Sequence, residues 1–186
     1  MPSFTRNAIK QSFVKLLNQR PISQITVKDI VEDCGINRNS FYYHFSDMPA
    51  LVEEIITDEA DRIISDYSSI DSIEEGFNAA IQFILDNKKA VYHIYNSANR
   101  DIYVQYLMKI CRHVVVTYFD TVFPDAPVKD GDRELMIMFY KCELFGVIVE
   151  WLNTGMKLDI CRAFKRLCEL RKGMVEEMFN RCANGK

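Results

Sequence analysis

Apolar residues recur at three- and four-residue steps along most of the chain, which is the period of an amphipathic α-helix. No alternating strand pattern, internal repeat or low-complexity tract interrupts this period. Pro21 ends the first helical segment, because proline has no backbone N–H to donate. The spacing therefore predicts a first helix over residues 4–17, and its inner face is expected to carry Phe4, Ala8, Ile9, Phe13, Leu16 and Leu17.

Three closely spaced helix starts follow. Thr26 precedes Asp29 at the spacing of a capping box, and the helix that it opens ends before Gly35, a residue suited to the left-handed position after a helix. Asn37 can cap the next short helix, and Asp47 can cap a long amphipathic fourth helix. Two short helices joined by a Gly-containing turn form a helix-turn-helix. Its core is expected to contain Val27, Ile30, Val31, Ile36, Phe41 and Phe45.

The rest of the chain reads as a larger helical body, with its clearest break at 124–127. Helices are expected near 71–86, 88–97, 101–123, 132–154 and 158–182. We therefore predict an all-α fold with an N-terminal three-helix helix-turn-helix head, residues 1–46, and a regulatory and dimerisation body, residues 47–186. The junction is expected inside the fourth helix, without a flexible linker.

Charge separates the two ends of the chain. The formal net charge is −3, but residues 1–50 carry +2 and the remainder carries −5. A mildly basic head permits a polyanionic partner such as nucleic acid and does not establish one. No apolar run approaches the roughly 18 residues of a membrane span, and the first residues show no signal peptide. We expect a cytoplasmic protein with no membrane partner.

The reactive side chains show no enzyme signature. The sequence lacks GxSxG, GxGxxG, HExxH, P-loop and zinc-binding spacings, so we predict no enzyme, no cofactor and no metal. The six cysteines form no CxxC pair and are interpreted as free, buried thiols. Cys161 and Cys168 share a helix face, and a redox or metal sensor remains the alternative for that pair.

The third helix carries the chemistry for reading a DNA duplex. Arg pairs with guanine O6 and N7, and Asn with adenine N6 and N7, when a helix N-terminus enters the major groove. The alternative is a solvated polar helix beside core aromatics. The residues expected to read bases are Asn37, Arg38, Asn39 and Tyr43; those expected to contact phosphates are Thr26, Lys28, Ser40, Tyr42 and His44.

Residues 25–51, ITVKDIVEDCGINRNSFYYHFSDMPAL, resemble the head of the tetracycline-repressor (TetR) family of bacterial regulators. The shared pattern comprises Thr26, Val27, Asp29, Ile30, Gly35, Ile36, Ser40, Phe41, Tyr42, His44, Phe45, Asp47 and Leu51. The resemblance implies a repressor that binds a palindromic double-stranded DNA operator as a homodimer and responds to a small-molecule effector. One alternative within the family is an activator or protein-interaction partner with weak autonomous DNA binding.

Residues 143–156 are similar to the penultimate helix of many family members, which pairs with its mate in a second subunit. The alternative is a helix buried within the monomer. The resemblance implies that dimerisation involves Phe145, Gly146, Val149, Trp151 and Leu152. An effector pocket is implied in the body, and its candidate lining, which could equally be plain core, is Tyr92, Tyr103, Tyr106 and Phe119.

One position departs from the family pattern. Members often carry a Lys after the Asp that opens the fourth helix, where it meets a phosphate, but this chain has Met48 and Pro49. Losing one phosphate contact weakens binding at every DNA sequence. Arg6, Lys10 and Lys28 are candidates to supply the missing charge, although each could equally be solvated.

Overall fold

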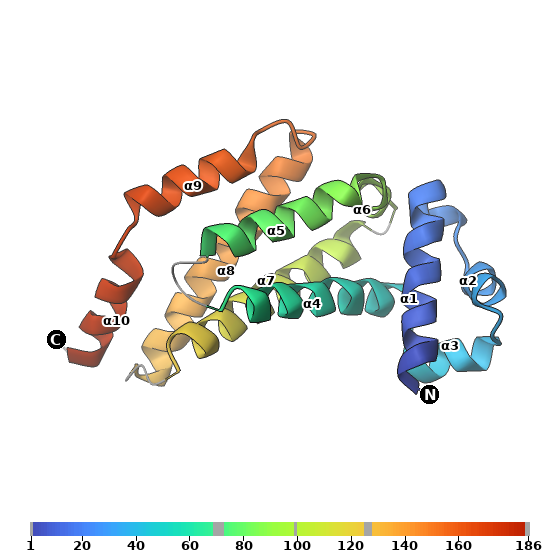
Figure 1. Cartoon of the computed structure of the whole chain (residues 1–186), viewed down its shortest axis with the longest axis horizontal. Helices are drawn as coiled ribbons and strands as arrows, with labels where there is room; N and C mark the ends of the chain where they lie inside the picture. The colour runs from blue at the N-terminus through green and yellow to red at the C-terminus, as the bar shows by residue number, and fades with distance from the viewer. Residues whose placement is uncertain (1, 69–72, 99, 125–127, 185–186) are drawn as a thin grey trace. The chain divides into compact units, whose positions relative to one another are not determined.

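The structure is a computed structural model that describes residues 2–68, 73–98, 100–124 and 128–184 (Figure 1). These residues contain ten α-helices and no strand, which confirms the all-α fold. A single 3-10 turn, Ile22–Gln24, lies between the first two helices. The helices are α1 (Pro2–Gln19), α2 (Val27–Cys34), α3 (Arg38–His44), α4 (Met48–Asp66), α5 (Ile73–Asp86), α6 (Lys88–Tyr95), α7 (Arg100–Val122), α8 (Asp130–Asn153), α9 (Ile160–Leu170) and α10 (Met174–Asn184).

The chain divides into two compact units. The head unit comprises residues 1–58 and 83–107, and the body unit comprises residues 59–82 and 108–186. This division differs from the boundary at residues 46 and 47 expected from sequence. The head unit includes the first part of α4, the whole of α6 and the start of α7, because side chains from these helices belong to its core.

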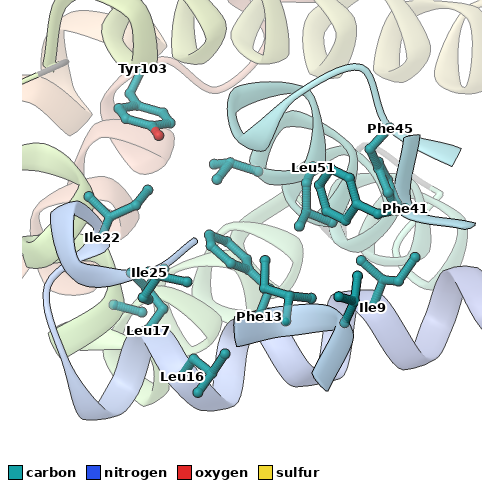
Figure 2. Packing of buried hydrophobic residues seen from close by; sticks show 14 residues of the cluster. Ile9, Phe13, Leu16, Leu17, Ile22, Ile25, Phe41, Phe45, Leu51 and Tyr103 are labelled. Carbon is teal, nitrogen blue, oxygen red and sulfur yellow. The ribbon is translucent and has the colours of Figure 1, made fainter. Parts of the chain in front are cut away.

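The core of the head unit is a cluster of aliphatic and aromatic side chains. Phe13 of α1, Ile30 of α2 and Phe41 of α3 are each at most 1% exposed, and Leu51 of α4 is fully buried. Figure 2 shows Tyr103 of α7 beside this cluster, where it is 8% exposed. A helix of seven or eight residues is too short to be stable alone. Packing on α1 and α4 therefore stabilises α2 and α3.

Phe4 does not lie on the inner face of α1, where the periodicity placed it. Its side chain is 81% exposed, whereas Ile9 and Phe13 are buried. Nine residues at about 100° each place Phe4 on the opposite side of the helix from Phe13. The expected inner face was therefore wrong at its first residue.

The body unit has its own aromatic cluster. Phe119 of α7 is 6% exposed and lies edge-on to Tyr140 of α8 and Phe179 of α10. Phe123 stacks on Phe179 with ring centroids 4.3 Å apart. Met136 and Ile137 of α8 are buried in the same cluster. Packing of α7, α8 and α10 around these rings stabilises one end of the body unit.

The single helix predicted over 158–182 is wrong, because two helices occupy that range. α9 ends at Leu170 and α10 begins at Met174. Gly173 between them has a φ of 81°, a left-handed conformation that cannot continue a right-handed helix. The break lets Phe179 pack on the aromatic cluster.

Two expectations fall outside the described residues: the start of the fifth helix at 71–72, and positions 125–127 of the break before α8. Over the parts of the chain that are described, no helix combines the length and apolar character needed to cross a membrane.

Candidate nucleic-acid interface

The first helix of the helix-turn-helix begins with the expected capping box. The Thr26 hydroxyl accepts a hydrogen bond from the Asp29 N–H at 3.2 Å, and the Thr26 N–H donates to Asp29 Oδ2 at 2.7 Å. The Thr26 hydroxyl also donates to Asp29 Oδ2 at 2.6 Å. These bonds, with the Arg20 guanidinium 3.0 Å from Asp29 Oδ1, lower the pKa of Asp29 to about 2. The box fixes the position at which α2 begins.

The turn between α2 and α3 follows from two residues. Gly35 has a φ of 69°, and its N–H bonds back to the Glu32 carbonyl at 3.3 Å. A side chain in this left-handed conformation would be strained, which explains the glycine. Asn37 then caps α3, since its Oδ1 accepts the Ser40 N–H at 2.9 Å. The two caps and the glycine hold α3 at a defined angle to α2.

The exposed side of α3 presents three of the four residues expected to read bases. Arg38 and Asn39 begin the helix in exposed positions, and the Tyr43 side chain is 80% exposed. Asn37 is also exposed, but its Oδ1 already accepts from the Ser40 N–H and hydroxyl. Bidentate pairing of Asn37 with adenine would compete with its capping role, because adenine N6 requires the same oxygen.

The residues expected to contact phosphates are unequally available. Both hydrogen-bond donors of Thr26, its N–H and its hydroxyl, are bound to Asp29, so a phosphate would compete with the capping box. Lys28 is exposed and lies 3.6 Å from Glu32. Tyr42 is 56% exposed, whereas Ser40 and His44 are half-buried. All nine DNA-contact assignments remain predictions.

Acid partners occupy most of the positive charge in the head. Six Lys and Arg side chains lie in residues 1–50, and five of them form ion pairs. The pairs are Arg6 with Glu54, Lys10 with Glu54 and Asp58, Lys15 with Asp33, Arg20 with Asp29, and Lys28 with Glu32. Among the described residues, Arg38 has no such partner. Among the basic side chains of residues 1–50, the one without an ion pair in the described residues therefore lies at the start of α3.

Arg6 and Lys10 are not free to replace the phosphate contact that the family's Lys would make. Both side chains are bound to Glu54 of α4, and this bonding raises the pKa of Arg6. A phosphate would have to displace the Glu54 carboxylate. The Lys10 and Glu54 side chains are only 13% and 20% exposed, so this displacement would break a partly buried ion pair and offset part of the gain.

The start of α4 offers little to a phosphate. Asp47 caps this helix by accepting the Ala50 N–H at 2.8 Å, and Pro49 has no N–H. The Met48 side chain is half-buried against the core of the head unit. An apolar side chain, an acidic cap and a proline thus occupy the position where the family pattern has its phosphate-binding Lys.

The residues expected at a dimer interface lie on two different sides of α8. Gly146 is exposed, with open space where a Cβ would project, and Phe145 and Val149 are half-buried. Trp151 and Leu152 are only 3% and 6% exposed, and the Trp151 Nε1–H donates to the Leu158 carbonyl at 3.1 Å. Five or six residues at about 100° each separate them from Gly146 by 120–140° around the helix. Trp151 and Leu152 belong to the interior of the body unit.

A larger apolar surface on α8 escaped the sequence reasoning. Leu135, Met138 and Phe139 are 59%, 51% and 56% exposed, and Cys142 is also exposed. We define the α8 stripe as Leu135, Met138, Phe139, Cys142, Gly146 and Val149. Their spacing of 3, 1, 3, 4 and 3 residues places all six on one face. That spacing was visible in the sequence, but the richly apolar opposite face concealed it.

The four residues suggested for an effector pocket belong to both units. Tyr92, Tyr103 and Tyr106 lie in the head unit, and Phe119 lies in the aromatic cluster of the body unit. Burial raises the pKa of the Tyr103 hydroxyl to about 12, and the nearby Asp47 carboxylate adds to this shift. Tyr103 packs with the core of the head, as the alternative interpretation held. A ligand role for these residues remains a prediction.

The body unit contains a different depression, an open groove of about 480 Å³ between α4 and α7. Polar and apolar surfaces both line it, and the Asp61 carboxylate bonds to the His113 imidazole. The lining residues are Asp61, Ile64, Ser65, Ser68, His113, Thr117 and Thr121. No group of three or more metal-ligating side chains occurs within the described segments.

Two family comparisons cover most of the chain. Residues 14–55 match the family described as "Bacterial regulatory proteins, tetR family", and residues 71–173 match the "Transcriptional regulator C-terminal region" of such proteins. The fold and the helix-turn-helix thus define a DNA-binding transcriptional regulator. The chain belongs to the TetR family of bacterial transcriptional regulators.

Individual relatives are distant. The chain is 20% identical over 167 residues to the uncharacterized HTH-type transcriptional regulator YxbF of Bacillus subtilis, covering 82% of this chain and 41% of that protein. It is 30% identical over 69 residues to the HTH-type transcriptional repressor KstR2 of Mycolicibacterium smegmatis, covering 37% and 34% respectively. The chain therefore spans less than half the length of either relative. Among solved structures, NalD, a secondary repressor of a multidrug efflux pump in Pseudomonas aeruginosa, is similar with a TM-score of 0.49 and 16% identity over 97% of both chains.

Proposed function

We propose that this chain is a homodimeric repressor that reads a palindromic DNA operator with α3 and releases it when a small-molecule effector binds. The observation that carries the proposal is the state of Arg38. It is exposed at the start of α3, and it is the basic side chain of residues 1–50 without an acid partner among the described residues. A guanidinium without an ion pair at the N-terminus of a recognition helix can donate two hydrogen bonds to guanine O6 and N7.

Base reading by α3 follows from its exposed residues. The major groove of B-DNA is about 12 Å wide and admits one α-helix. With the start of α3 in the groove, Arg38 donates two hydrogen bonds to guanine, and Asn39 and Tyr43 face neighbouring bases. Lys28 and Tyr42 lie at the sides of the helix-turn-helix and contact phosphates. One such head reads only a few base pairs, so useful specificity requires two.

The α8 stripe supports the second subunit. Leu135, Met138 and Phe139 expose large apolar side chains on one helix face, and Gly146 lets another backbone approach closely. An isologous interface repeats the same contacts about a two-fold axis, so a continuous stripe on one helix is sufficient to form it. A two-fold dimer in turn requires a palindromic operator with half-sites about one helical turn, or a multiple of it, apart.

The DNA arm of the test is fluorescence anisotropy of the purified chain on duplexes that tile its own upstream region, at several salt concentrations. We expect one duplex to bind about a thousandfold more tightly than the others. Arg38→Ala should weaken that duplex by about 1–3 kcal/mol and leave scrambled DNA nearly unchanged. Lys28→Ala is the matched control, because loss of a phosphate contact weakens every duplex alike. Equal affinity of Arg38→Ala and wild type for the preferred duplex would remove Arg38 from base reading.

The dimer arm uses the α8 stripe. Phe139→Asp places a charge in the proposed interface and should cost about 2 kcal/mol or more, a thirtyfold or larger rise in the dimer Kd. Leu85→Asp is the control, since Leu85 is a similarly exposed apolar residue, at 39%, on α5. Sedimentation velocity over a concentration series measures both variants. A Phe139→Asp protein that dimerises like wild type would rule out this surface.

Regulation by an effector would act through a shift between two arrangements of the dimer. A hundredfold loss of operator affinity requires the effector to bind the released arrangement more tightly by about 2.7 kcal/mol. The preferred duplex provides the assay, because a true effector lowers anisotropy on that duplex in a saturable manner. A compound that also lowers the anisotropy of the Arg38→Ala variant on scrambled DNA would be interfering nonspecifically instead.

One observation favours the second candidate, an activator or protein-interaction partner with weak autonomous DNA binding. Met48 and Pro49 replace the usual phosphate contact, and Glu54 already binds Arg6 and Lys10. This function predicts uniform, weak binding that disappears with salt, with specificity only when a second protein is present. The same salt series distinguishes the two candidates.

A further inference from the structure

Part of the head's core comes from α6 and the start of α7. Ala90 of α6 is 5% exposed and Tyr103 of α7 is 8% exposed, and both belong to the same buried cluster as Phe13 and Leu17 of α1. Ile94, one turn after Ala90, packs against that cluster as well. One face of α6 is therefore committed to α1, and the helix-turn-helix is not an independent three-helix domain.

The end of α1 has an unfilled backbone acceptor. In an α-helix the carbonyl of residue i accepts from the N–H of residue i+4, and the donor for Leu17 would be residue 21. That residue is Pro21, which has no N–H. The preceding carbonyl, that of Leu16, accepts a hydrogen bond from the Arg20 N–H at 3.0 Å. The Leu17 carbonyl is therefore the first of α1 that lacks its helical donor. Leu17 itself is 2% exposed, and a buried carbonyl without a donor is costly.

His93 of α6 fills this acceptor. Its Nδ1 lies 2.8 Å from the Leu17 carbonyl oxygen, in a half-buried position. A carbonyl oxygen can only accept a hydrogen bond, so His93 must carry a proton on Nδ1. The bond joins residues 76 positions apart in the chain and is directional, unlike the apolar contacts around it.

The position of α1 is transmitted to the recognition helix by further contacts. The Ser12 hydroxyl donates to the Ile30 carbonyl of α2 at 3.3 Å, and Lys15 lies 2.6 Å from Asp33 of the same helix. α2 is followed directly by the Gly35 turn and α3. A displacement at the end of α1 therefore moves α2 and α3 with it.

We propose that His93 is a positioning residue for DNA reading: its Nδ1–H anchors the end of α1, where Pro21 removes the helical donor, and so fixes the arrangement in which α3 fits the operator. The inference rests on the proposed function, because it assigns His93 a role in operator binding. His93 does not touch DNA. It determines in what fraction of the protein α1 and the helix-turn-helix are held against α6 in the arrangement that binds DNA.

The experiment compares three variants of the full chain at His93. The side-chain amide N–H of Asn can take the place of the Nδ1–H, whereas that of Gln extends one carbon further and Leu has no donor. We expect His93→Leu and His93→Gln to weaken binding to the preferred operator about two- to tenfold, the amount one net hydrogen bond is worth. His93→Asn should remain within twofold of wild type. His113→Leu is the control, because that histidine bonds to Asp61 in the body unit.

Two readouts separate positioning from other roles. A positioning residue leaves the salt dependence of binding unchanged, since no phosphate contact is lost. Thermal unfolding of each variant shows whether a lower affinity follows from a lower fraction of folded protein. Operator binding of His93→Leu equal to wild type would overturn the proposal. His93→Asn as weak as His93→Gln would also overturn it, because shape and not the hydrogen bond would then matter.

A measurement without DNA distinguishes this inference from the proposed function. Nitrogen–proton correlation NMR of wild type at about pH 8 reports which ring nitrogen of His93 carries the proton. A proton on Nδ1 supports the anchor, and a proton on Nε2 alone overturns it, whatever the protein binds. If wild type shows no preferred duplex while Nδ1 is protonated, the proposed function fails and the structural anchor stands.

Discussion

Substitution of Met48 by Lys tests whether the start of α4 faces a DNA phosphate. Met48 is the first residue of α4, and its side chain packs half-buried against the core of the head unit. A Lys side chain can lie along the same apolar surface and extend its ammonium group into solvent. The variant would restore the positive charge that the family pattern has at this position, without disturbing the Asp47 cap that holds the start of the helix.

The expected magnitude comes from counterion release. One added phosphate contact makes the slope of log K against log salt more negative by about 0.9. Over a fourfold rise in salt, from about 50 to 200 mM, the advantage of the variant should therefore shrink about 3.5-fold. Because a phosphate carries no sequence information, the gain should be similar on preferred and scrambled duplexes.

Anisotropy titrations at four or more salt concentrations measure this slope. Met48→Gln is the first control, since it makes the side chain polar without adding charge. Ser65→Lys is the second control, because it adds the same charge on α4 at an exposed position in the body unit. A slope for Met48→Lys equal to that of Ser65→Lys would refute the reasoning, and would show that the start of α4 does not face a phosphate.

Three further predictions follow from the geometry. Thr26→Ala removes the cap of α2 and should lower the free energy of unfolding by about 1 kcal/mol, measured by urea denaturation; an unchanged midpoint would contradict the capping role. The low pKa of Asp29, about 2, means that its charged form stabilises the fold above its ordinary pKa near 4 and that this contribution is lost as the pH falls toward 2. The stability difference between wild type and Asp29→Asn should therefore narrow over that range, and a constant difference would contradict it. In the Phe139→Asp variant, whose α8 stripe no second subunit covers, iodoacetamide should modify Cys142 well before Cys111. Cys111 is 1% exposed, and burial raises the pKa of its thiol to about 12. Mass mapping of labelled peptides gives the order.

Local signals in the sequence located the helix-turn-helix well. Thr26 with Asp29, Gly35 and Asn37 specify where short helices begin and end, and their hydrogen bonds and backbone angles depend mainly on near neighbours. The structure confirms both caps and the left-handed glycine. The helical period failed at Phe4, where the side of the helix depends on which neighbours cover it.

Long-range contacts account for what the sequence left open. The availability of a basic side chain depends on acids far along the chain, as for Arg6 with Glu54. On α8, Met136 and Ile137 are buried by packing with α7 and α10, whereas Phe139 is exposed, and composition alone could not separate them. Apolar residues on both sides of one helix look alike until their neighbours are known.

By itself, the sequence determined the all-α class, the position of the helix-turn-helix and the family, because these rest on helical period, capping residues and a motif of adjacent positions. Only the tertiary structure decided that Arg38 is the basic side chain of residues 1–50 without an ion pair in the described residues. It also decided that α6 completes the core of the head unit and that His93 meets the carbonyl left without a donor by Pro21. Each of these depends on residues separated by tens of positions and brought together by burial of apolar surface.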